Sequence, residues 1–328
     1  MIFFMKICVT GAAGFIGFHV SNALMARGDT VVGLDNLNDY YDPKLKQDRL
    51  AILEKNESFT FHKIDISDKD GVAKIFAEKK FDRVIHLAAQ AGVRYSIQNP
   101  YAYIESNIMG HLNILEGCRN SDSVQNLVYA SSSSVYGMNE NKPFKTSDFV
   151  DNPISLYAAT KKSDELMSYC YSHLYNIPMS GLRFFTVYGP WGRPDMAYFS
   201  FTKDILDGRG IKVFNHGKMR RDFTYIDDIV AGVIAACDNP PEKDEKGVAH
   251  RVYNLGNNKS ETLMDFISTI ESALGQEAEK EMLPMQAGDV VETYADISES
   301  QKYLNYNPLT KISKGIPEFI KWYKGYYS

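Results

Sequence analysis

Tyr157 and Lys161 are spaced so that they could act together on a proton. Residues four apart lie on one face of a helix, and both belong to the predicted helix Tyr157–Tyr175. A phenol alone is too weak an acid to serve as a base at neutral pH, but a nearby ammonium favours the phenolate. The pair therefore indicates either a general base acting on a hydroxyl or a solvated helix surface, and the spacing alone does not choose.

A run of four serines, Ser131–Ser134, directly follows the predicted strand Asn126–Ala130. Open α/β sheets bind ligands at the carboxyl ends of their strands, so hydroxyls here could contact a substrate. The alternative is an ordinary polar turn. Because the Tyr/Lys pair follows on a helix, we interpret the serines and that pair as parts of one catalytic constellation.

A glycine triplet follows the first predicted strand and opens the first helix. Gly11, Gly14 and Gly17 allow a sharp turn and a close approach to a pyrophosphate, which the free N–H groups at Phe15 and Ile16 could bind. The spacing is GxxGxxG, unlike the commoner GxGxxG. An acid at the end of the second strand, Asp35, could accept from both ribose hydroxyls and would repel a 2′-phosphate. This combination predicts NAD rather than NADP.

The ends of two further strands fit the same cofactor. Asp65, followed by Ile66, ends the third strand, where an acid could reach the adenine amino group. The fourth strand ends in Leu87, Ala88 and Ala89, whose small alanines would let the nicotinamide ribose pass close to the backbone. His86 is interpreted as a packed strand residue.

The elements that position these residues alternate between strand and helix through the first half of the chain. The predicted strands are Lys6–Val9, Thr30–Leu34, Phe59–Lys63, Arg83–Leu87, Asn126–Ala130 and Met179–Phe184, and the helices between them include Phe15–Arg27, Lys69–Glu78 and Asn107–Cys118. Such alternation predicts an α/β fold with a Rossmann-type doubly wound parallel sheet. We expect an NAD-binding domain over 1–180, also receiving 224–258, and a smaller mixed α/β substrate lobe over 181–328.

Bulk composition excludes several classes of protein. Apolar residues make up 44% and charged residues 23% of 328 positions, which is globular composition, and the net charge of −5 argues against nucleic-acid binding. Four widely separated cysteines suggest a reducing compartment, with neither a disulfide framework nor a metal site. No apolar run approaches the length of about 18 residues needed to span a membrane. The N-terminus lacks a signal-peptide pattern, so we expect a cytoplasmic protein.

Four motifs together carry a family resemblance: the glycine triplet, Ser131–Gly137, the YxxxK pair and Arg221–Asp228. The chain resembles extended short-chain dehydrogenases/reductases of the sugar-nucleotide epimerase/dehydratase group along essentially its whole length. The resemblance implies roles for individual residues: Ser132, Tyr157 and Lys161 as the catalytic triad, Asn36 and Asn107 beside NAD, Arg221 at the nucleotide diphosphate, Asp289 at the uridine ribose, and Val213 at the substrate.

Further segments narrow the resemblance to UDP-glucuronate 4-epimerases. They are Asp35–Tyr41, Gln90–Ser96, Arg183–Pro190 and Trp191–Ala197. The likeness implies reversible conversion of UDP-glucuronate to UDP-galacturonate through a transient 4-keto sugar, with enzyme-bound NAD. Related dehydratases carry an acid pair, and related decarboxylases a Glu, where this chain has Ser133 and Ser134.

A 4-keto uronate is a β-keto acid and can lose CO2. We hypothesise that Ser133 and Ser134, with Thr186, hydrogen-bond the C5 carboxylate and hold it out of alignment with the carbonyl π system; such charge-assisted bonds are worth about 1.5–3 kcal/mol each. Arg94 and Arg193 are candidate partners for substrate charge, although a loop arginine can equally be solvated or ion-paired.

Other functions remain open from sequence. The nearest is a UDP-glucose or UDP-N-acetylhexosamine 4-epimerase, next a UDP-glucuronate decarboxylase or dehydratase, and more remotely an inert NAD-binding regulatory subunit. The resemblance also implies a homodimer formed through the helices Asn107–Cys118 and Tyr157–Tyr175. No nucleic acid, membrane or metal is expected as a partner.

Overall fold

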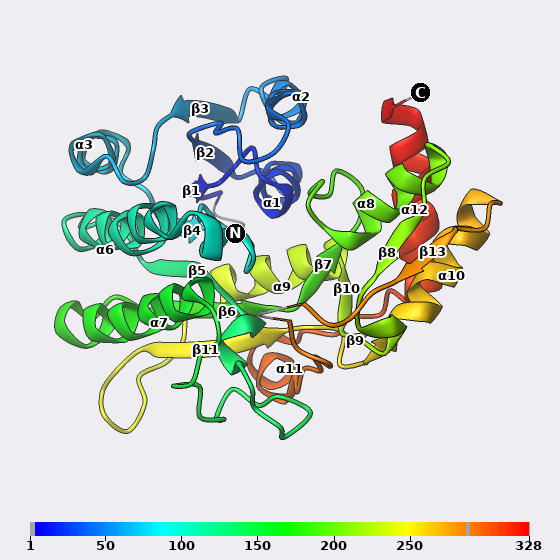
Figure 1. The fold of residues 1–328 in the computed structure, drawn as a ribbon. Coiled ribbons are helices and arrows are strands. Elements are labelled where there is room, and N and C mark those ends of the chain that lie inside the picture. The colour runs from blue at the N-terminus through cyan, green and yellow to red at the C-terminus, as the bar shows by residue number, and fades with distance from the viewer. Residues whose placement is uncertain (1–3, 287–288, 328) are drawn as a thin grey trace.

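A parallel sheet of seven strands forms the centre of the computed structural model, which describes residues 4–286 and 289–327 (Figure 1). Its strand order is β11-β6-β5-β4-β1-β2-β3. The strands are β1 Lys6–Thr10, β2 Thr30–Asp35, β3 Phe59–Lys63, β4 Arg83–His86, β5 Asn126–Ser132, β6 Met179–Phe184 and β11 His250–Leu255. The order reverses between β1 and β4, where open α/β sheets bind ligands. The predicted Rossmann-type sheet is confirmed.

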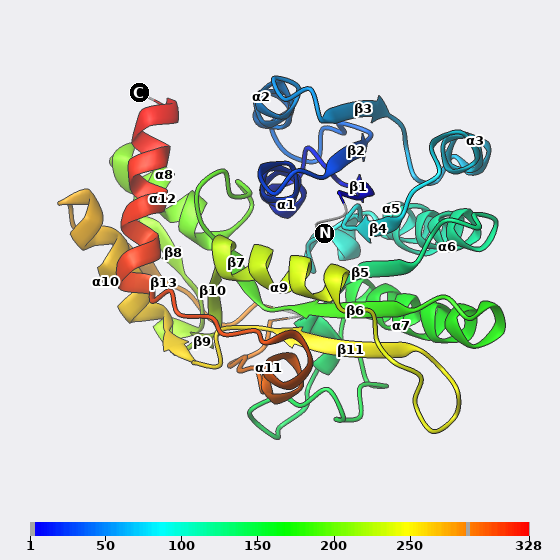
Figure 2. The ribbon, with the colours of Figure 1, turned by 180° about the vertical axis from the view of Figure 1, so that it is seen from behind.

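Successive side chains of β1 enter two separate hydrophobic cores, one on each face of the sheet. Ile7 and Val9 join one core and Cys8 joins the other, all fully buried. Helices cover both faces, as a parallel sheet requires (Figure 2). One side carries α1 Phe15–Ala26, α2 Pro43–Leu53 and α9 Ile226–Asp238, and the other carries α3 Lys69–Lys79, α6 Gly110–Arg119 and α7 Leu156–Tyr175.

A smaller lobe of mixed structure lies beyond the carboxyl ends of the strands (Figure 1). Its helices are α8 Ala197–Leu206, α10 Leu263–Leu274 and α12 Ile312–Tyr327, while α11 Ser298–Leu304 packs beside β11 and α9 (Figure 1). Three two-stranded sheets pair β7 Thr186–Tyr188 with β10 Phe223–Tyr225, β8 Ile211–Val213 with β13 Lys280–Met282, and β9 Arg220–Arg221 with β12 Glu261–Thr262. Phe223 stacks on Phe266 with ring centroids 3.9 Å apart, inside this lobe's core. The expected smaller α/β lobe is thus present.

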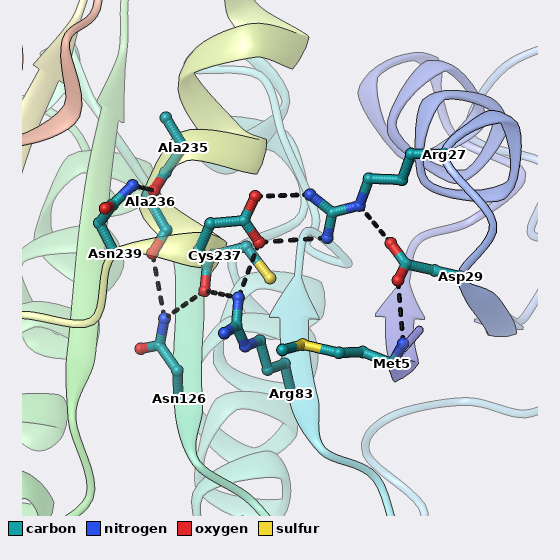
Figure 3. Close-up of polar contacts among 10 residues, drawn as sticks. Met5, Arg27, Asp29, Arg83, Asn126, Ala235, Ala236, Cys237 and Asn239 are labelled. Carbon is teal, nitrogen blue, oxygen red and sulfur yellow. Dashed lines mark hydrogen bonds and ion pairs between the residues drawn. The ribbon is translucent and has the colours of Figure 1, made fainter. Parts of the chain in front are cut away.

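Helix α9 runs from the small lobe across the sheet, and polar side chains at the amino edge of the sheet hold its C-terminus (Figure 3). Asn126 Nδ2 donates to the carbonyls of Ala236 and Cys237, each at 3.0 Å, and Arg83 donates to Cys237 O at 2.7 Å. Arg83 and Arg27 also pair with Asp238. The last carbonyls of a helix need partners from outside it, and cations are favourable at that end of the helix dipole.

Two segments differ from the sequence-based expectation. Helix α2, Pro43–Leu53, was not predicted, although Asp42 caps it and proline occupies its first turn. The helix expected over Asn107–Cys118 begins earlier, as α5 Pro100–Tyr103 and a π-helix η1 Ile104–Met109, before α6 continues to Arg119, and a separate short helix α4 Tyr95–Gln98 precedes it. The π-helix breaks the 3.6-residue period on which the prediction rested.

The described residues carry neither a membrane-crossing helix nor a metal-like cluster. Within 4–286 and 289–327, no helix joins enough length to enough apolar character to cross a bilayer. The same residues contain no group of three or more His, Cys, Asp or Glu side chains arranged to hold a metal ion. All four cysteines are free thiols.

Candidate active site

Two adjoining pockets lie at the carboxyl edge of the sheet. The larger, here called the long pocket, runs past the ends of β1, β2, β3, β4 and β5 to the start of α7. The smaller, here called the side pocket, lies between η2 Ser133–Tyr136 and the small lobe. The serines connect the two, because Ser132 lines the long pocket while Ser133 and Ser134 line the side pocket.

Most of the residues predicted for the cofactor and for catalysis line the long pocket. They are Gly11, Gly14, Phe15, Ile16, Gly17, Asp35, Asn36, Asp65, Ile66, Leu87, Ala88, Ala89, Ser132, Tyr157 and Lys161. Arg193, predicted for the substrate, also lines this pocket. Segments from Gly11 to Arg193 therefore meet at one edge of the sheet.

The glycine loop packs so tightly that a side chain at any of Gly11, Gly14 and Gly17 would meet the backbone. Gly11 has a φ of +70°, and a Cβ there would lie 2.8 Å from the backbone N of Ala88. A Cβ on Gly17 would lie 2.1 Å from the carbonyl oxygen of Gly11. Helix α1 begins without a side-chain cap on Gly14, so the N–H groups of its first turn border the long pocket. This is the geometry of an anion site at a helix N-terminus.

Asp35 and Asp65 present carboxylates at the ends of β2 and β3. Asp35 accepts from the backbone N–H of Ala13 at 3.1 Å and of Leu37 at 2.9 Å. Burial raises the pKa of Asp35, against the lowering effect of these donors and of Lys46. Burial also opposes ionisation of Asp65, but hydrogen bonds from Asn36 and Ser67 outweigh it and lower the pKa of that carboxyl.

The Tyr/Lys pair occupies the first turns of α7, whose N-terminus is capped by Ser155 Oγ accepting from Ala158 N at 3.1 Å. Lys161 is 3% exposed, and its Nζ donates to Ala130 O at 3.1 Å and to Asp164 Oδ2 at 3.0 Å. Two of the three ammonium hydrogens are thus directed by the protein, while the side chain borders the long pocket. Tyr157 is half-buried beside it.

Ser132 ends β5 and caps the short helix η2. Its hydroxyl accepts from Ser134 N at 3.1 Å and donates to Ser134 Oγ at 3.1 Å. The side chains of Ser133 and Ser134 are half-buried, and Thr186 at the start of β7 lines the same side pocket. Hydroxyl groups from two elements therefore face one small hollow next to the Tyr/Lys pair.

The far end of the side pocket carries charge. Arg221 and Asp289 both line it, and Arg94 pairs with Asp289 at 3.2 Å from the outside, where Arg94 is 56% exposed. Burial lowers the pKa of Arg221, although Asp289 opposes this, and Arg221 donates to the carbonyls of Arg220 and Val291. The pocket thus places a cation and an anion from the small lobe opposite the serines.

Three residues predicted for the site are not simply exposed to a pocket: two of them line neither pocket, and the third is paired with an acid. The side chain of Asn107 in η1 accepts from the backbone N–H of Gln90 at 2.8 Å and donates to the carbonyl of Gln90 and to Thr160 Oγ1 at 3.1 and 3.0 Å. It therefore ties the segment that follows β4 to α7. Val213 is fully buried in β8 and lines neither pocket. Arg193 pairs with Asp195 at 2.5 Å, and Tyr40 also donates to Asp195.

Several residues of this region were missed from sequence. Lys46 on α2 lines the long pocket and donates to Asn38 O at 2.8 Å. Arg49, fully buried, donates to Ala13 O at 3.0 Å and to Trp191 O at 2.6 Å, so it joins the glycine loop to the loop that bears Arg193. Asp164, which pairs with Lys161, was also missed. Its position three residues after Lys161 on a helix was the one sequence signal for this ion pair.

His86 is a packed strand residue in the structure. Its Nδ1 lies 2.7 Å from Thr10 Oγ1, and its ring stacks on His111 with centroids 5.3 Å apart. Burial, with the field of Lys161, lowers the pKa of His86 to about 3, so the imidazole is neutral at physiological pH.

Comparisons with known proteins agree on the family. The NAD dependent epimerase/dehydratase family matches residues 7–256. The chain is 52% identical to Protein CapI of Staphylococcus aureus, over 98% of this chain and 99% of that one, and 50% identical to UDP-glucuronate 4-epimerase 4 of Arabidopsis thaliana, over 99% and 76%. The crystal structure of UDP-glucuronic acid 4-epimerase from Bacillus cereus with UDP-glucuronic acid and NAD superposes with a TM-score of 0.89, at 36% identity over 98% and 99% of the chains.

Proposed function

This chain belongs to the NAD dependent epimerase/dehydratase family, and from that premise we propose that it interconverts UDP-glucuronate and UDP-galacturonate by inverting C4 of the sugar. The observation that carries the proposal is the junction of the two pockets. There Tyr157 and Lys161 border the long pocket, and the hydroxyls of Ser133 and Ser134 border the side pocket beside it. A base for C4 and donors for a C5 carboxylate thus lie next to each other.

The long pocket suits NAD in shape and charge. The absence of room for a Cβ at Gly11 and Gly17 and the uncapped N-terminus of α1 suit a pyrophosphate. Asp35 at the end of β2 suits a free ribose 2′-hydroxyl and disfavours a 2′-phosphate. When bound, NAD supplies the hydride acceptor and donor for the sugar carbon.

Tyr157 is proposed as the group that takes and returns the proton of the C4 hydroxyl. The Lys161 ammonium favours the phenolate, and its third N–H is free to hold a ribose hydroxyl in the long pocket. Ser132, at the end of β5, is proposed to hydrogen-bond the same C4 oxygen. After the 4-keto sugar has turned over in the pocket, Tyr157 and Ser132 can act on its opposite face. The reaction is therefore reversible and needs no further acid or base.

The serine pair is proposed to protect the substrate carboxylate. The side pocket offers the hydroxyls of Ser133, Ser134 and Thr186, and no carboxylate lines it near η2 among the described residues. Hydrogen bonds from these groups would hold the C5 carboxylate away from the alignment that releases CO2. Dehydration, which requires an acid pair beside the sugar, lacks its usual group at Ser133 and Ser134.

The nucleotide end of the substrate is proposed to lie against the small lobe. Arg221 is the half-buried cation available to a diphosphate, Asp289 the acceptor available to ribose hydroxyls, and Arg94 a second cation at the outer rim. Val213 would contribute packing from β8 and not a direct contact. Arg193, although neutralised by Asp195, borders the long pocket and is proposed to face the sugar.

The decisive experiment uses purified protein and UDP-glucuronate without added cofactor, with products resolved by chromatography and mass. We expect UDP-galacturonate of unchanged mass. UDP-glucose and UDP-N-acetylglucosamine run in parallel, and faster turnover of either would replace the proposal with a neutral-sugar 4-epimerase. Loss of the mass of CO2 or of water would instead indicate a decarboxylase or dehydratase, and no conversion of any sugar would indicate a regulatory NAD-binding subunit.

A homodimer in the cytoplasm is the proposed working state. Leu166, Tyr169 and Leu174 of α7 are 60%, 37% and 57% exposed, an apolar stripe that a second copy of α7 and α6 would cover. Free thiols at all four cysteines suit a reducing compartment. The mass in solution by light scattering tests the dimer, and a monomeric mass at working concentration would contradict it.

A further inference from the structure

The ammonium of Lys161 has a buried anion as its direct partner. Asp164 lies three residues further along α7, with Oδ2 3.0 Å from Lys161 Nζ, and the two side chains are 1% and 3% exposed. The other carboxylate oxygen, Oδ1, is buried and makes no hydrogen bond within the residues that the structure describes. The carboxylate is therefore held by the lysine and by little else.

The other titratable groups around this pair are either paired or neutral. Arg183 binds Glu165 in two bonds of 2.8 Å, although the charge of Glu165 still acts to raise the pKa of Asp164. His111 on α6 lies 2.9 Å from Ser168 Oγ, and burial keeps it neutral, as it does His86 on β4. Burial also raises the pKa of Tyr129 on β5. In the described structure, Asp164 is thus the anion that acts on Lys161.

We infer that Asp164 is a positioning residue for the proposed reaction: its carboxylate keeps the Lys161 ammonium charged and oriented, and so sets the pH range in which Tyr157 exchanges a proton with the sugar. The inference rests on the proposed function. Asp164 touches neither pocket, so it acts through Lys161 alone.

The geometry gives the carboxylate two opposing effects. It stabilises the charged lysine in a site that water does not reach, and with Ala130 O it fixes two ammonium hydrogens so that the third is directed to the long pocket. It also offsets part of the positive field that favours the Tyr157 phenolate. Burial raises the pKa of Asp164, and the attraction of Lys161 opposes this.

The test replaces Asp164 with asparagine in the NAD-loaded protein. Without the negative charge the phenolate forms more easily and the ammonium is lost more easily, so both limbs of the kcat–pH profile should move to lower pH by about one unit or more. The matched control is Asp151→Asn, which removes a carboxylate 3.8 Å from Lys162, at a site where Asp151 is 55% exposed. Its profile should coincide with that of the parent protein.

A second readout does not depend on turnover. The ultraviolet absorbance of the Tyr157 phenolate, taken as the difference between each protein and its Tyr157→Phe counterpart, gives the pH at which the phenolate forms. Asp164→Asn should lower that pH, and Asp164→Glu should bring it back towards the parent value. If Asp164→Asn fails to fold, Asp164→Ser takes its place in both measurements.

The outcomes separate the two proposals. A lower kcat with unmoved limbs and an unmoved phenolate titration would reduce Asp164 to a packing role and overturn the inference. If the parent protein does not convert UDP-glucuronate, the proposed function fails, but the phenolate titration still shows whether Asp164 controls the Tyr/Lys pair.

Discussion

The two edges of the parallel sheet both collect polar side chains, and they use them differently. At the amino edge, Asn126 and Arg83 donate to carbonyls at the end of α9, and Arg83 also pairs with Asp238 (Figure 3). At the carboxyl edge, Tyr157 and Ser133 border open pockets. The first arrangement satisfies groups that folding would otherwise leave unpaired, while the second leaves hydrogen-bonding capacity for a ligand.

The contrast suggests a division of roles: contacts at the amino edge hold the two lobes together, and residues at the carboxyl edge bind ligands and carry out the reaction. Helix α9 starts directly after β10 in the small lobe and ends on the amino edge of the sheet, so its anchoring fixes the small lobe against the strands. Polar groups at the amino edge should therefore affect stability and not the reaction. Groups at the carboxyl edge should affect the reaction and leave stability nearly unchanged.

The largest effect is expected from Tyr157→Phe, which removes one oxygen at the carboxyl edge. Loss of the proton acceptor for the C4 hydroxyl should lower kcat by about 10²–10⁴-fold, because that is the usual contribution of a positioned general base. The thermal midpoint should change little, since Tyr157 is only half-buried. Initial rates by product chromatography and a thermal melt measure the two quantities.

The matched control is Tyr169→Phe, a hydroxyl deletion on the exposed side of the same helix, where Tyr169 is 37% exposed. It should retain the parent rate. Interconversion of the two uronates at the parent rate by Tyr157→Phe would contradict the assigned role of the phenol.

The second effect concerns the cofactor. Asp35→Ser should weaken NAD binding about 10- to 100-fold, because hydrogen bonds to a charged group are worth about 1.5–3 kcal/mol. Binding of NADP should weaken less or improve, since the repelling carboxylate is gone and Lys46 lines the same pocket. Calorimetric titration with both dinucleotides measures this, with Asp39→Ser as a control that removes an exposed acid from the same loop.

The third effect appears in the products. Ser133→Ala should raise the proportion of UDP-pentose and CO2 relative to UDP-galacturonate about tenfold, because one hydrogen bond to the uronate carboxylate is lost. Mass analysis of the nucleotide sugars gives the ratio. Ser147→Ala, an exposed serine in the following loop, should leave it unchanged. An identical ratio in Ser133→Ala would remove Ser133 from the carboxylate site.

The site residues at the carboxyl edge of the sheet could be predicted from the sequence because they lie directly after predicted strands. Gly11 and Asp35 each follow a recognisable apolar run, Asp65 follows a strand with alternating phenylalanines, and parallel topology then brings the strand ends together. The alternation of strands and helices likewise sufficed to predict the sheet. These inferences need only local patterns and the general rule for open α/β sheets.

The contacts that support the site could not be foreseen in the same way. Arg49 bonds Ala13 and Trp191, which lie 36 and 142 residues away, so its role depends on how α2 packs. The π-helix that carries Asn107 follows no simple period. Val213 was predicted for the substrate, but full burial in β8 keeps it from both pockets.

We expect the smallest effect on activity from Asn126→Ala. This substitution also tests the contrast between the two edges of the sheet most directly. The side chain of Asn126 is 1% exposed and donates to two carbonyls of α9, so Asn126→Ala removes the side-chain donor of Ala236 O, while Cys237 O keeps the donor that Arg83 provides. We expect a loss of about 1–3 kcal/mol in the free energy of unfolding, measured by denaturant titration, with kcat and NAD affinity unchanged. Asn239→Ala is the control, because Asn239 donates to Ala235 O at an exposed position where water can replace it, and it should cost less. A fall in kcat for Asn126→Ala without a fall in stability would show that the amino edge takes part in the reaction, and the division of labour between the edges would not hold.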